Sequence, residues 1–122
     1  MKKLFALSLS LLMMVSCSSA QKEIQVGALS FDEYLPLLEG KRVSILSNQT
    51  GMVSSTTHLL ATLLDMGVNV VSIMSPEHGF RGVADAGEHV SSSIDPDTGI
   101  PIRSLYESGV NRPSDESMAE FD

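Results

Sequence analysis

The sequence predicts an α/β fold, with a Rossmann-like parallel sheet and flanking helices. Two apolar segments rich in β-branched residues, 41–47 and 68–74, stand on either side of a segment with leucines at helical spacing. A strand, a helix and a strand within about 35 residues form a βαβ unit, whose strands are parallel. The second strand leads into a loop dense with acids, bases and glycines, residues 75–89. Open α/β sheets bind ligands at the carboxyl ends of their strands, so this loop is the first candidate for function.

The first helix is expected to begin after Ser30. Ser30 and Glu33 have the spacing of a capping box, in which each side chain bonds a backbone N–H of the first turn. Pro36 should interrupt or restart this helix, because proline lacks the N–H that a helix interior uses. Gly40 should end it.

The helix between the two strands has the clearest periodic pattern. Thr57 is its candidate N-cap and Gly67 supplies the stop, while the leucines at positions 59, 60, 63 and 64 form one apolar face. The two strands that it joins therefore point their carboxyl ends toward the same edge of the sheet.

The last part of the chain contains weaker signals. Residues 99–106 could hold a short third strand, and residues 113–118 a short helix with Ser114 or Asp115 near its N-cap. The chain stops at Asp122 without a cap or a polar tail. We expect it to be a fragment of a longer domain.

The amino terminus has the features of an export signal. Lys2 and Lys3 precede an apolar run over residues 4–15, and small residues follow it. The run is too short to span a bilayer permanently. Residues 1–16 are therefore expected to be a signal peptide and to lie outside the fold.

Cys17 is the only cysteine and stands where the apolar run ends. The surrounding pattern resembles a bacterial lipobox, in which this cysteine carries the lipid; the alternative is an ordinary signal peptide cut near Ala20. We expect a lipoprotein with a tether over 17–28 and a domain over 29–122. It would be exported and anchored by its lipid to a bacterial membrane, facing the periplasm or the cell surface.

The mature chain is acidic, which limits its partners. The whole sequence has a formal charge of −7, and without Lys2 and Lys3 six basic residues stand against fifteen acidic ones, giving −9. Nucleic-acid binding depends on Lys and Arg that neutralise phosphates. We therefore expect no nucleic acid as a partner.

Glu77 and Glu88 are candidates for a catalytic pair. Cleavage of a glycosidic bond needs one carboxyl group to protonate the leaving oxygen and commonly a second to stabilise or attack the anomeric carbon. Two glutamates in a glycine-rich loop can supply both, but solvated surface charges would give the same pattern. From the residues alone both interpretations stay open.

Arg81 and Asp85 lie between these glutamates. Arg81 could bind a carboxylate by a two-pronged contact, or it could pair with Glu77 or Asp85 and hold the loop. Asp85 could position Arg81 or a sugar hydroxyl, or cap a turn. The glycines at 79, 82 and 87 would let the loop approach a ligand or take positive φ, or merely form turns.

Asn48, Gln49 and Thr50 end the first strand. They lack the lysine and the glycine spacing of a phosphate loop. Their amides and hydroxyl suit a neutral ligand such as a sugar, although a plain polar turn explains them equally well. We predict no cofactor.

Three histidines raise the question of a metal. His78 and His89 each follow a glutamate, but their spacing matches no usual zinc arrangement and no cysteine ligand is near. His58, near the start of the leucine-rich helix, is expected at the surface or at its boundary. We predict no metal site.

Four motifs in order resemble the amino-terminal part of the NamZ-like (YbbC-like) family: Ser47-Asn48-Gln49-Thr50-Gly51, Ser75-Pro76-Glu77-His78-Gly79-Phe80-Arg81-Gly82, Asp85-Ala86-Gly87-Glu88, and Asp97-Thr98-Gly99-Ile100-Pro101 with Ser104-Leu105-Tyr106. The family includes exo-β-N-acetylmuramidases, which remove terminal N-acetylmuramic acid from peptidoglycan fragments. The resemblance covers residues 30–122. It implies a Rossmann-like domain whose next strand starts at about Phe121. A smaller carboxyl-terminal domain, not included here, would complete the cleft.

The resemblance also implies roles for the candidate residues. Glu77 would be the general acid and Glu88 the second catalytic carboxylate, or Glu88 would orient a substrate acetamido group that acts as nucleophile. The sugar site would be lined by Asn48, Gln49, Thr50, His78, Arg81 and Asp85, with Arg81 a candidate partner for the lactyl carboxylate.

The leading expectation is thus a lipid-anchored exo-glycosidase of cell-wall recycling that acts on sugars containing N-acetylmuramic acid, here as a partial chain. A non-catalytic lipoprotein that binds muropeptides through the same polar edge is the alternative. A metal-dependent hydrolase that uses His78 and His89 is a third and weaker interpretation.

Overall fold

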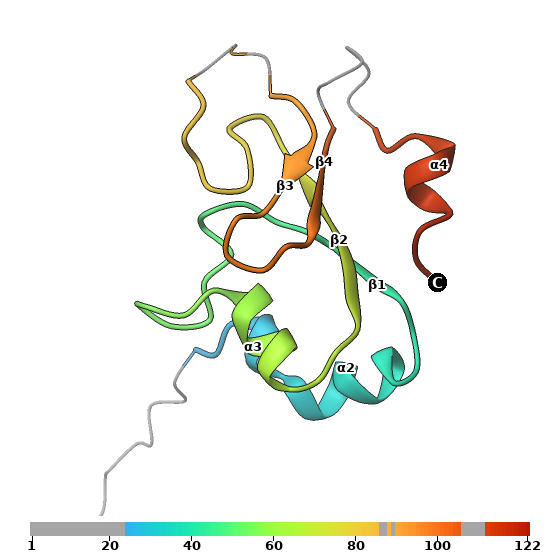
Figure 1. The fold of residues 1–122 in the computed structure, drawn as a ribbon. Coiled ribbons are helices and arrows are strands. Elements are labelled where there is room, and N and C mark those ends of the chain that lie inside the picture. Colours follow the sequence, from blue (N-terminus) through green and yellow to red (C-terminus); the bar gives the residue numbers. More distant parts are fainter. Residues whose placement is uncertain (1–23, 86–87, 89, 106–111) are drawn as a thin grey trace, which may run out of the picture.

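Four strands form the central sheet, in the spatial order β1 Val43–Leu46, β2 Val70–Ser75, β4 Pro101–Ser104 and β3 Ser93–Ile94 (Figure 1). The structure is a computed structural model that describes residues 24–85, 88, 90–105 and 112–122. Strands β1, β2 and β4 are parallel, and β3 is antiparallel to β4. The predicted α/β class with a mainly parallel sheet is confirmed. The predicted signal peptide and Cys17 lie outside the described residues.

The helices in the described residues are η1 Gly27–Leu29, a single 3-10 turn, and the α-helices α2 Phe31–Leu38, α3 Leu59–Asp65 and α4 Asp115–Met118. Helices α2 and α3 lie close together, whereas α4 stands apart from both (Figure 1). Across the described part of the chain, no helix has the length and apolar character needed to cross a bilayer.

A row of isoleucines across three strands forms the centre of the core. The strand register pairs Ile45 with Ile73 and Ile73 with Ile102, so the three side chains lie on the same face of the sheet. All three are buried, Ile73 with 0% exposure, and they pack with Leu60 and Leu63 of α3. The leucine periodicity of α3 therefore has a physical cause, because its apolar face covers this row.

The other face of the sheet is more polar. Ser72 lies beside Ser44 in the register and its Oγ donates to the Ser44 Oγ at 2.9 Å. Leu46 stays 66% exposed, although Met74, its neighbour in the register, is buried. Side chains of α2 join those of α3 on the isoleucine face, whereas on the other face Ser72 and Met74 of the central strand β2 are also buried.

Helix α2 differs from its prediction at two points. Ser30 is the residue before the helix but its side chain makes no capping bond, so the predicted capping box is wrong. Its backbone torsions, φ −80° and ψ 53°, differ from the extended conformation of a usual N-cap. Pro36 lies inside the helix and does not interrupt it, because packing of Leu35 and Leu38 on the core supports the turn that loses one N–H. Gly40, with φ +69°, follows the helix as expected.

The remaining elements match their predictions in kind and differ at their ends. The carboxyl-terminal helix begins at Asp115, and Ser114 is its N-cap, with its Oγ accepting the Ser117 N–H at 3.2 Å. The two-residue strand β3 was not predicted. Residues 121–122 form no strand, but the Asp122 N–H donates to the Arg42 carbonyl at 2.9 Å, just before β1 begins.

Candidate functional site

The polar turn after β1 is built around the side chain of Asn48. Its Oδ1 accepts from the Thr50 N–H at 3.0 Å and from the Thr50 Oγ1 at 2.7 Å. This is the Asx arrangement, in which a side-chain oxygen replaces a backbone carbonyl in a turn. We call residues 47–52 the β1 loop. Because the side-chain oxygen of Asn48 is already used within the turn, Asn48 would contact a ligand through its NH₂ group.

His58 fixes the β1 loop and begins helix α3. Its Nδ1 accepts the Leu60 N–H at 3.1 Å, which makes His58 the N-cap in place of the predicted Thr57. Because Nδ1 accepts, the proton must be on Nε2, which donates to the Asn48 carbonyl at 2.8 Å. The ring also meets the buried Phe80 edge-on, with 5.1 Å between centroids. The expectation of a surface or boundary residue missed these three contacts.

We expect His58→Ala to lower the free energy of unfolding by about 0.5–2 kcal/mol, the usual cost of a lost N-cap. The matched control is Thr57→Ala, which removes the side chain that the sequence favoured as the cap and should change stability far less. Urea unfolding of both variants measures the difference. Equal losses would contradict the assignment of His58 as the cap.

The β1 loop touches the loop that follows β2, which we call the β2 loop and define as residues 76–88. A Cβ built on Gly82 would lie 2.3 Å from Cδ and 2.7 Å from Cγ of Gln49. The Gln49 side chain therefore lies directly over the Gly82 backbone, in the space that a Cβ at position 82 would take. Gly82 also has φ +69°, a torsion that L-residues avoid. The predicted meeting of the two loops at one sheet edge is confirmed.

The first half of the β2 loop presents Glu77 and His78 to solvent, and both are exposed. A hydrogen bond orients the imidazole ring of His78, whose Nδ1 donates to the Ala84 carbonyl at 3.1 Å. The Gly79 N–H donates to the Pro76 carbonyl at 3.0 Å, and Gly79 has φ +75°. These contacts fold the segment into a tight turn on which Glu77 is exposed to solvent.

Glu88 is oriented by a backbone donor. Its Oε2 accepts the Asp85 N–H at 2.8 Å, while its own N–H donates to the Asp85 carbonyl at 3.0 Å. Both residues are exposed. Ala86, Gly87 and His89 lie outside the described residues. The structure thus shows Asp85 and Glu88 tied to each other rather than Asp85 tied to Arg81.

Arg81 makes a pairing that the sequence analysis missed. Its Nε and Nη2 both donate to Asp95 Oδ1, at 2.9 and 2.6 Å, and Nη2 also lies 2.7 Å from Asp97 Oδ2. The guanidinium stands over the ring of Phe80, 5.1 Å from its centroid. The carboxylate partners of Arg81 are therefore Asp95 and Asp97, neither of which was considered, rather than Glu77 or Asp85.

Asp95 is fully buried but stays an ion. Burial alone would raise the pKa of its carboxyl group, but hydrogen bonds from Thr98 and Arg81, with the charge of Arg81, lower that pKa below its usual value. A lowered pKa in the folded chain gives stability that is present above the unfolded value, about 3.9, and is lost as the pH falls through the folded pKa.

Wild type should therefore be more stable than Asp95→Asn at neutral pH, and this difference should shrink below about pH 4. Asp97→Asn, at a position whose side chain is 70% exposed, should show a smaller difference at every pH. Urea unfolding at a series of pH values measures both. A wild-type advantage that grows on acidification would contradict the stated origin of the shift.

A hollow of about 400 Å³ opens where β1, β2 and β4 end. We call it the strand-end hollow. Its lining comes from the last residue of β1, the β1 loop, the first residue of the β2 loop and the residue after β4: Leu46, Ser47, Asn48, Thr50, Gly51, Pro76 and Leu105. Of the predicted site residues, Asn48 and Thr50 line it, and Glu77 follows directly after Pro76. Neither predicted catalytic carboxylate is among the lining residues, and the other predicted site residues are not among them either: Glu77, Glu88, Gln49, His78, Arg81 and Asp85.

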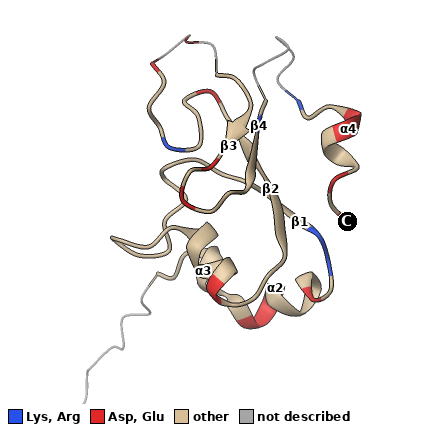
Figure 2. Cartoon of the chain, in the orientation of Figure 1, with Lys and Arg blue, Asp and Glu red and all other residues tan. Residues whose placement is uncertain are grey.

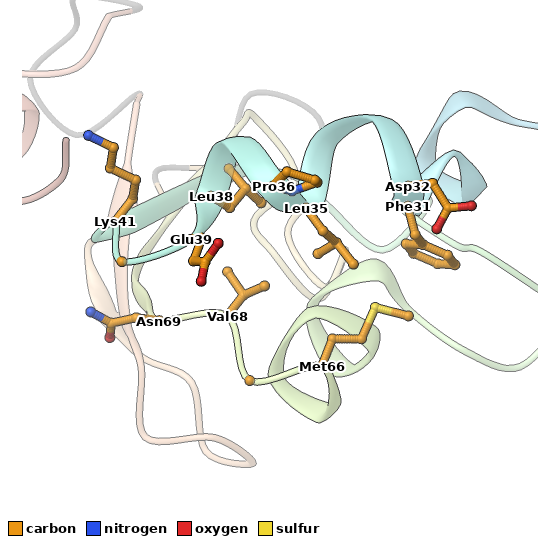
Figure 3. Close-up of a pocket in the computed structure, with 12 residues that line it drawn as sticks. Phe31, Asp32, Leu35, Pro36, Leu38, Glu39, Lys41, Met66, Val68 and Asn69 are labelled. Carbon is orange, nitrogen blue, oxygen red and sulfur yellow. The ribbon is translucent and has the colours of Figure 1, made fainter.

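A wider hollow of about 600 Å³ lies between α2 and the segment that follows α3. Figure 3 shows Phe31, Leu35 and Met66 facing it. It is situated before β1 and β2 begin, at the amino ends of these strands, and no predicted site residue lines it. Ligands of open α/β sheets bind at the opposite edge, so the strand-end hollow is the better candidate.

The distribution of charged side chains and of potential metal ligands describes the chemical groups available at this edge of the sheet. Acidic residues are spread over helices and loops and outnumber the few basic ones (Figure 2). In the parts of the chain that the structure describes, no three His, Cys, Asp or Glu side chains gather closely enough to hold a metal ion. The site is therefore a polar edge with amides, a hydroxyl and nearby carboxylates.

Comparison with known proteins gives concordant results. The family model "Exo-beta-N-acetylmuramidase NamZ, N-terminal" matches residues 43–122. Over 91 residues the chain is 34% identical to "Peptidoglycan beta-N-acetylmuramidase NamZ" of Bacillus subtilis (strain 168), covering 74% of this chain and 22% of that protein.

Two solved DUF1343 family proteins from Bacteroides fragilis NCTC 9343 have the same fold over the shared region. Their TM-scores are 0.64 and 0.62, with 44% and 32% sequence identity. The shared regions cover 82% and 75% of this chain but 24% and 22% of those chains. The chain thus spans less than a quarter of the length of these relatives. Because the family model matches well over half of the chain, and solved DUF1343 proteins share its fold, the chain belongs to the NamZ family, whose amino-terminal model matches residues 43–122.

Proposed function

We propose that the protein containing this chain is an exo-β-N-acetylmuramidase, which removes terminal N-acetylmuramic acid from peptidoglycan fragments during cell-wall recycling. The named Bacillus subtilis relative is a peptidoglycan β-N-acetylmuramidase, and the family model carries the same activity in its description. A substrate of this class is a neutral sugar ring with hydroxyl and acetamido groups and one lactyl carboxylate.

The contact between Gln49 and Gly82 is the observation that carries this proposal. It joins the amide-rich β1 loop to the β2 loop that bears Glu77, although the two loops are separated by helix α3 in the sequence. Amides and hydroxyls are the groups that recognise sugar hydroxyls, and an exposed carboxyl group at their edge can transfer a proton. The strand-end hollow then has the right neighbours for a terminal sugar.

In this proposal Glu77 protonates the leaving glycosidic oxygen. Its side chain is exposed on a turn fixed by Gly79 and His78, so a proton can reach it from solvent. Glu88 serves as the second carboxylate, either toward the anomeric carbon or toward the substrate acetamido group. The bond from the Asp85 N–H directs one of its oxygens.

We also propose that the protein is exported and held to a bacterial membrane by a lipid on Cys17. The support lies in the sequence, where the only cysteine is separated by a single residue from the end of the apolar run. Metabolic labelling with a palmitate analogue tests it. Label that is present on the wild type and lost in Cys17→Ser supports the anchor, and an unlabelled wild type argues against it.

The activity test uses the whole product of the gene that contains this chain. Hydrolysis of a chromogenic N-acetylmuramic acid glycoside should exceed that of the matching N-acetylglucosamine glycoside, which lacks the lactyl group. Binding of muropeptides is measured in parallel by calorimetry. Tight binding without turnover would favour the alternative of a non-catalytic muropeptide-binding lipoprotein, and loss of turnover with a chelator would favour a metal-dependent hydrolase.

A further inference from the structure

We propose that Asp95 is a positioning residue for the site: it holds Arg81, and through Arg81 it fixes the β2 loop that carries Glu77 and His78. This inference rests on the proposed glycosidase function for its kinetic consequence. Its structural basis is independent of that function, and begins with a carboxylate that has no contact with solvent.

Every hydrogen-bonding direction of the Asp95 carboxylate is occupied. Oδ1 accepts from Nε and Nη2 of Arg81, and Oδ2 accepts from the N–H of Thr98 at 3.1 Å and from its Oγ1 at 2.7 Å. A fully buried charge is tolerated only when it is paired and hydrogen-bonded in this way. The arrangement is therefore rigid, because moving Arg81 would leave a buried anion without its counter-charge.

Asp95 is itself fixed to the sheet. It follows β3 directly, its N–H donates to the Ile100 carbonyl at 2.9 Å, and its carbonyl accepts the Gly99 N–H at 2.8 Å. The turn leads into β4, whose Ser104 pairs with Ser75 at the end of β2. The end of β2 and the anchor of Arg81 therefore belong to one connected frame.

On the Arg81 side of the Arg81–Asp95 pair, three consecutive residues in the middle of the β2 loop are each held by a contact with another part of the chain. Phe80 is buried against the ring of His58, Arg81 is bound to Asp95, and Gly82 lies under Gln49. Glu77 and His78 stand between the end of β2 and this pinned segment. Both ends of their short turn are thus fixed, although Gly79 would give the backbone freedom.

Asp95→Asn removes the charge but keeps the shape, so it loosens the anchor without emptying the space. A neutral amide can still accept from Thr98 or Arg81, but charge-assisted bonds are about twice as strong as neutral ones. We expect kcat on the chromogenic N-acetylmuramic acid glycoside to fall about tenfold, because misplacing a catalytic group acts on the transition state. KM should change less, since the β1 loop keeps its own contacts.

Asp97→Asn is the matched control. Asp97 Oδ2 lies 2.7 Å from the same Nη2 atom, but its side chain is 70% exposed, whereas that of Asp95 is 0% exposed. Exposed ion pairs contribute little, so kcat of this variant should stay close to that of the wild type. The two variants make the same chemical change on two partners of one arginine.

Hydrogen exchange of the peptide covering residues 76–85 gives a second measurement that needs no activity. In the whole gene product, Asp95→Asn should speed exchange in this peptide and Asp97→Asn should not. Arg81→Lys serves as the second variant if Asp95→Asn fails to fold. It keeps a charge at an exposed position, loses the two-pronged contact, and should lower kcat more than it raises KM.

Unchanged exchange and unchanged kcat in Asp95→Asn, beside an active wild type, would overturn the inference while leaving the glycosidase intact. An Arg81→Lys variant that changes only KM would overturn it as well, and would assign Arg81 to the substrate carboxylate. If the wild type does not hydrolyse the glycoside, the proposed function fails. The exchange experiment then still decides, since faster exchange supports the anchor and unchanged exchange refutes it.

Discussion

Glu77→Gln is expected to lower kcat for hydrolysis of N-acetylmuramic acid glycosides by about 100- to 10,000-fold, the range by which a positioned general acid accelerates a reaction. Glutamine has nearly the same shape but has no proton to give at neutral pH. Glu77 is exposed on a turn beside the strand-end hollow, so its loss should leave the fold intact. Steady-state kinetics with the whole gene product, and an unfolding curve for each variant, measure the two effects separately.

Comparing substrates with different leaving groups tests whether Glu77 acts as the general acid. A nitrophenolate departs without protonation, whereas a sugar hydroxyl needs its proton as the bond breaks. The loss in Glu77→Gln should therefore be larger for a natural muropeptide than for the chromogenic glycoside. Glu88→Gln should lose activity toward both substrates by a similar factor. The reverse pattern would exchange the two roles.

Glu39→Gln is the matched control. Glu39 is exposed and lies beside the wider hollow at the amino ends of the strands. The same chemical change there should leave kcat and KM unaltered. A Glu77→Gln variant as active as Glu39→Gln would remove Glu77 from the mechanism.

The βαβ unit could be predicted from the sequence because its signals are local. Leucines that repeat along one helix face and β-branched runs on either side depend only on near neighbours, and Ile45, Ile73 and Ile102 then align through the register. Local rules failed where tertiary contacts decide. Pro36 stays within a helix that is packed on the core, and His58 caps α3 although histidine is not among the residues that usually do so.

The location of the candidate site could be predicted from the sequence, but the contacts between its side chains could not. Parallel strands place the β1 and β2 loops at one edge, which is a consequence of topology. The pairing of Arg81 with Asp95 joins residues fourteen positions apart through the β3–β4 turn, and β3 itself was too short to detect. The Asp97-Thr98-Gly99 motif was noticed in the sequence, but its physical role became visible only with Asp95 buried beside it.

Gly82→Ala is expected to lower kcat/KM for the same glycosides by about 100-fold, because a shift of about 1 Å in a substrate-positioning group has effects of this size. The added methyl group would meet Gln49 at 2.3 Å. Gln49 is exposed, so its side chain can swing outward and relieve the clash. The fold survives, but the amide leaves its place over the β2 loop.

Gly40→Ala separates this effect from backbone strain. Gly40 follows α2, away from the site, and has φ +69°, the same as Gly82, yet a Cβ there would meet nothing within 4 Å. Both variants should lose about 1–2 kcal/mol of stability from forcing alanine into the left-handed region, whereas only Gly82→Ala should lose activity at a temperature where both are folded. Urea unfolding and steady-state kinetics on the two variants test this. Equal activity in the two variants would mean that the contact between Gln49 and Gly82 does not shape the sugar site. The backbone strain that both variants share would then account for any loss of activity.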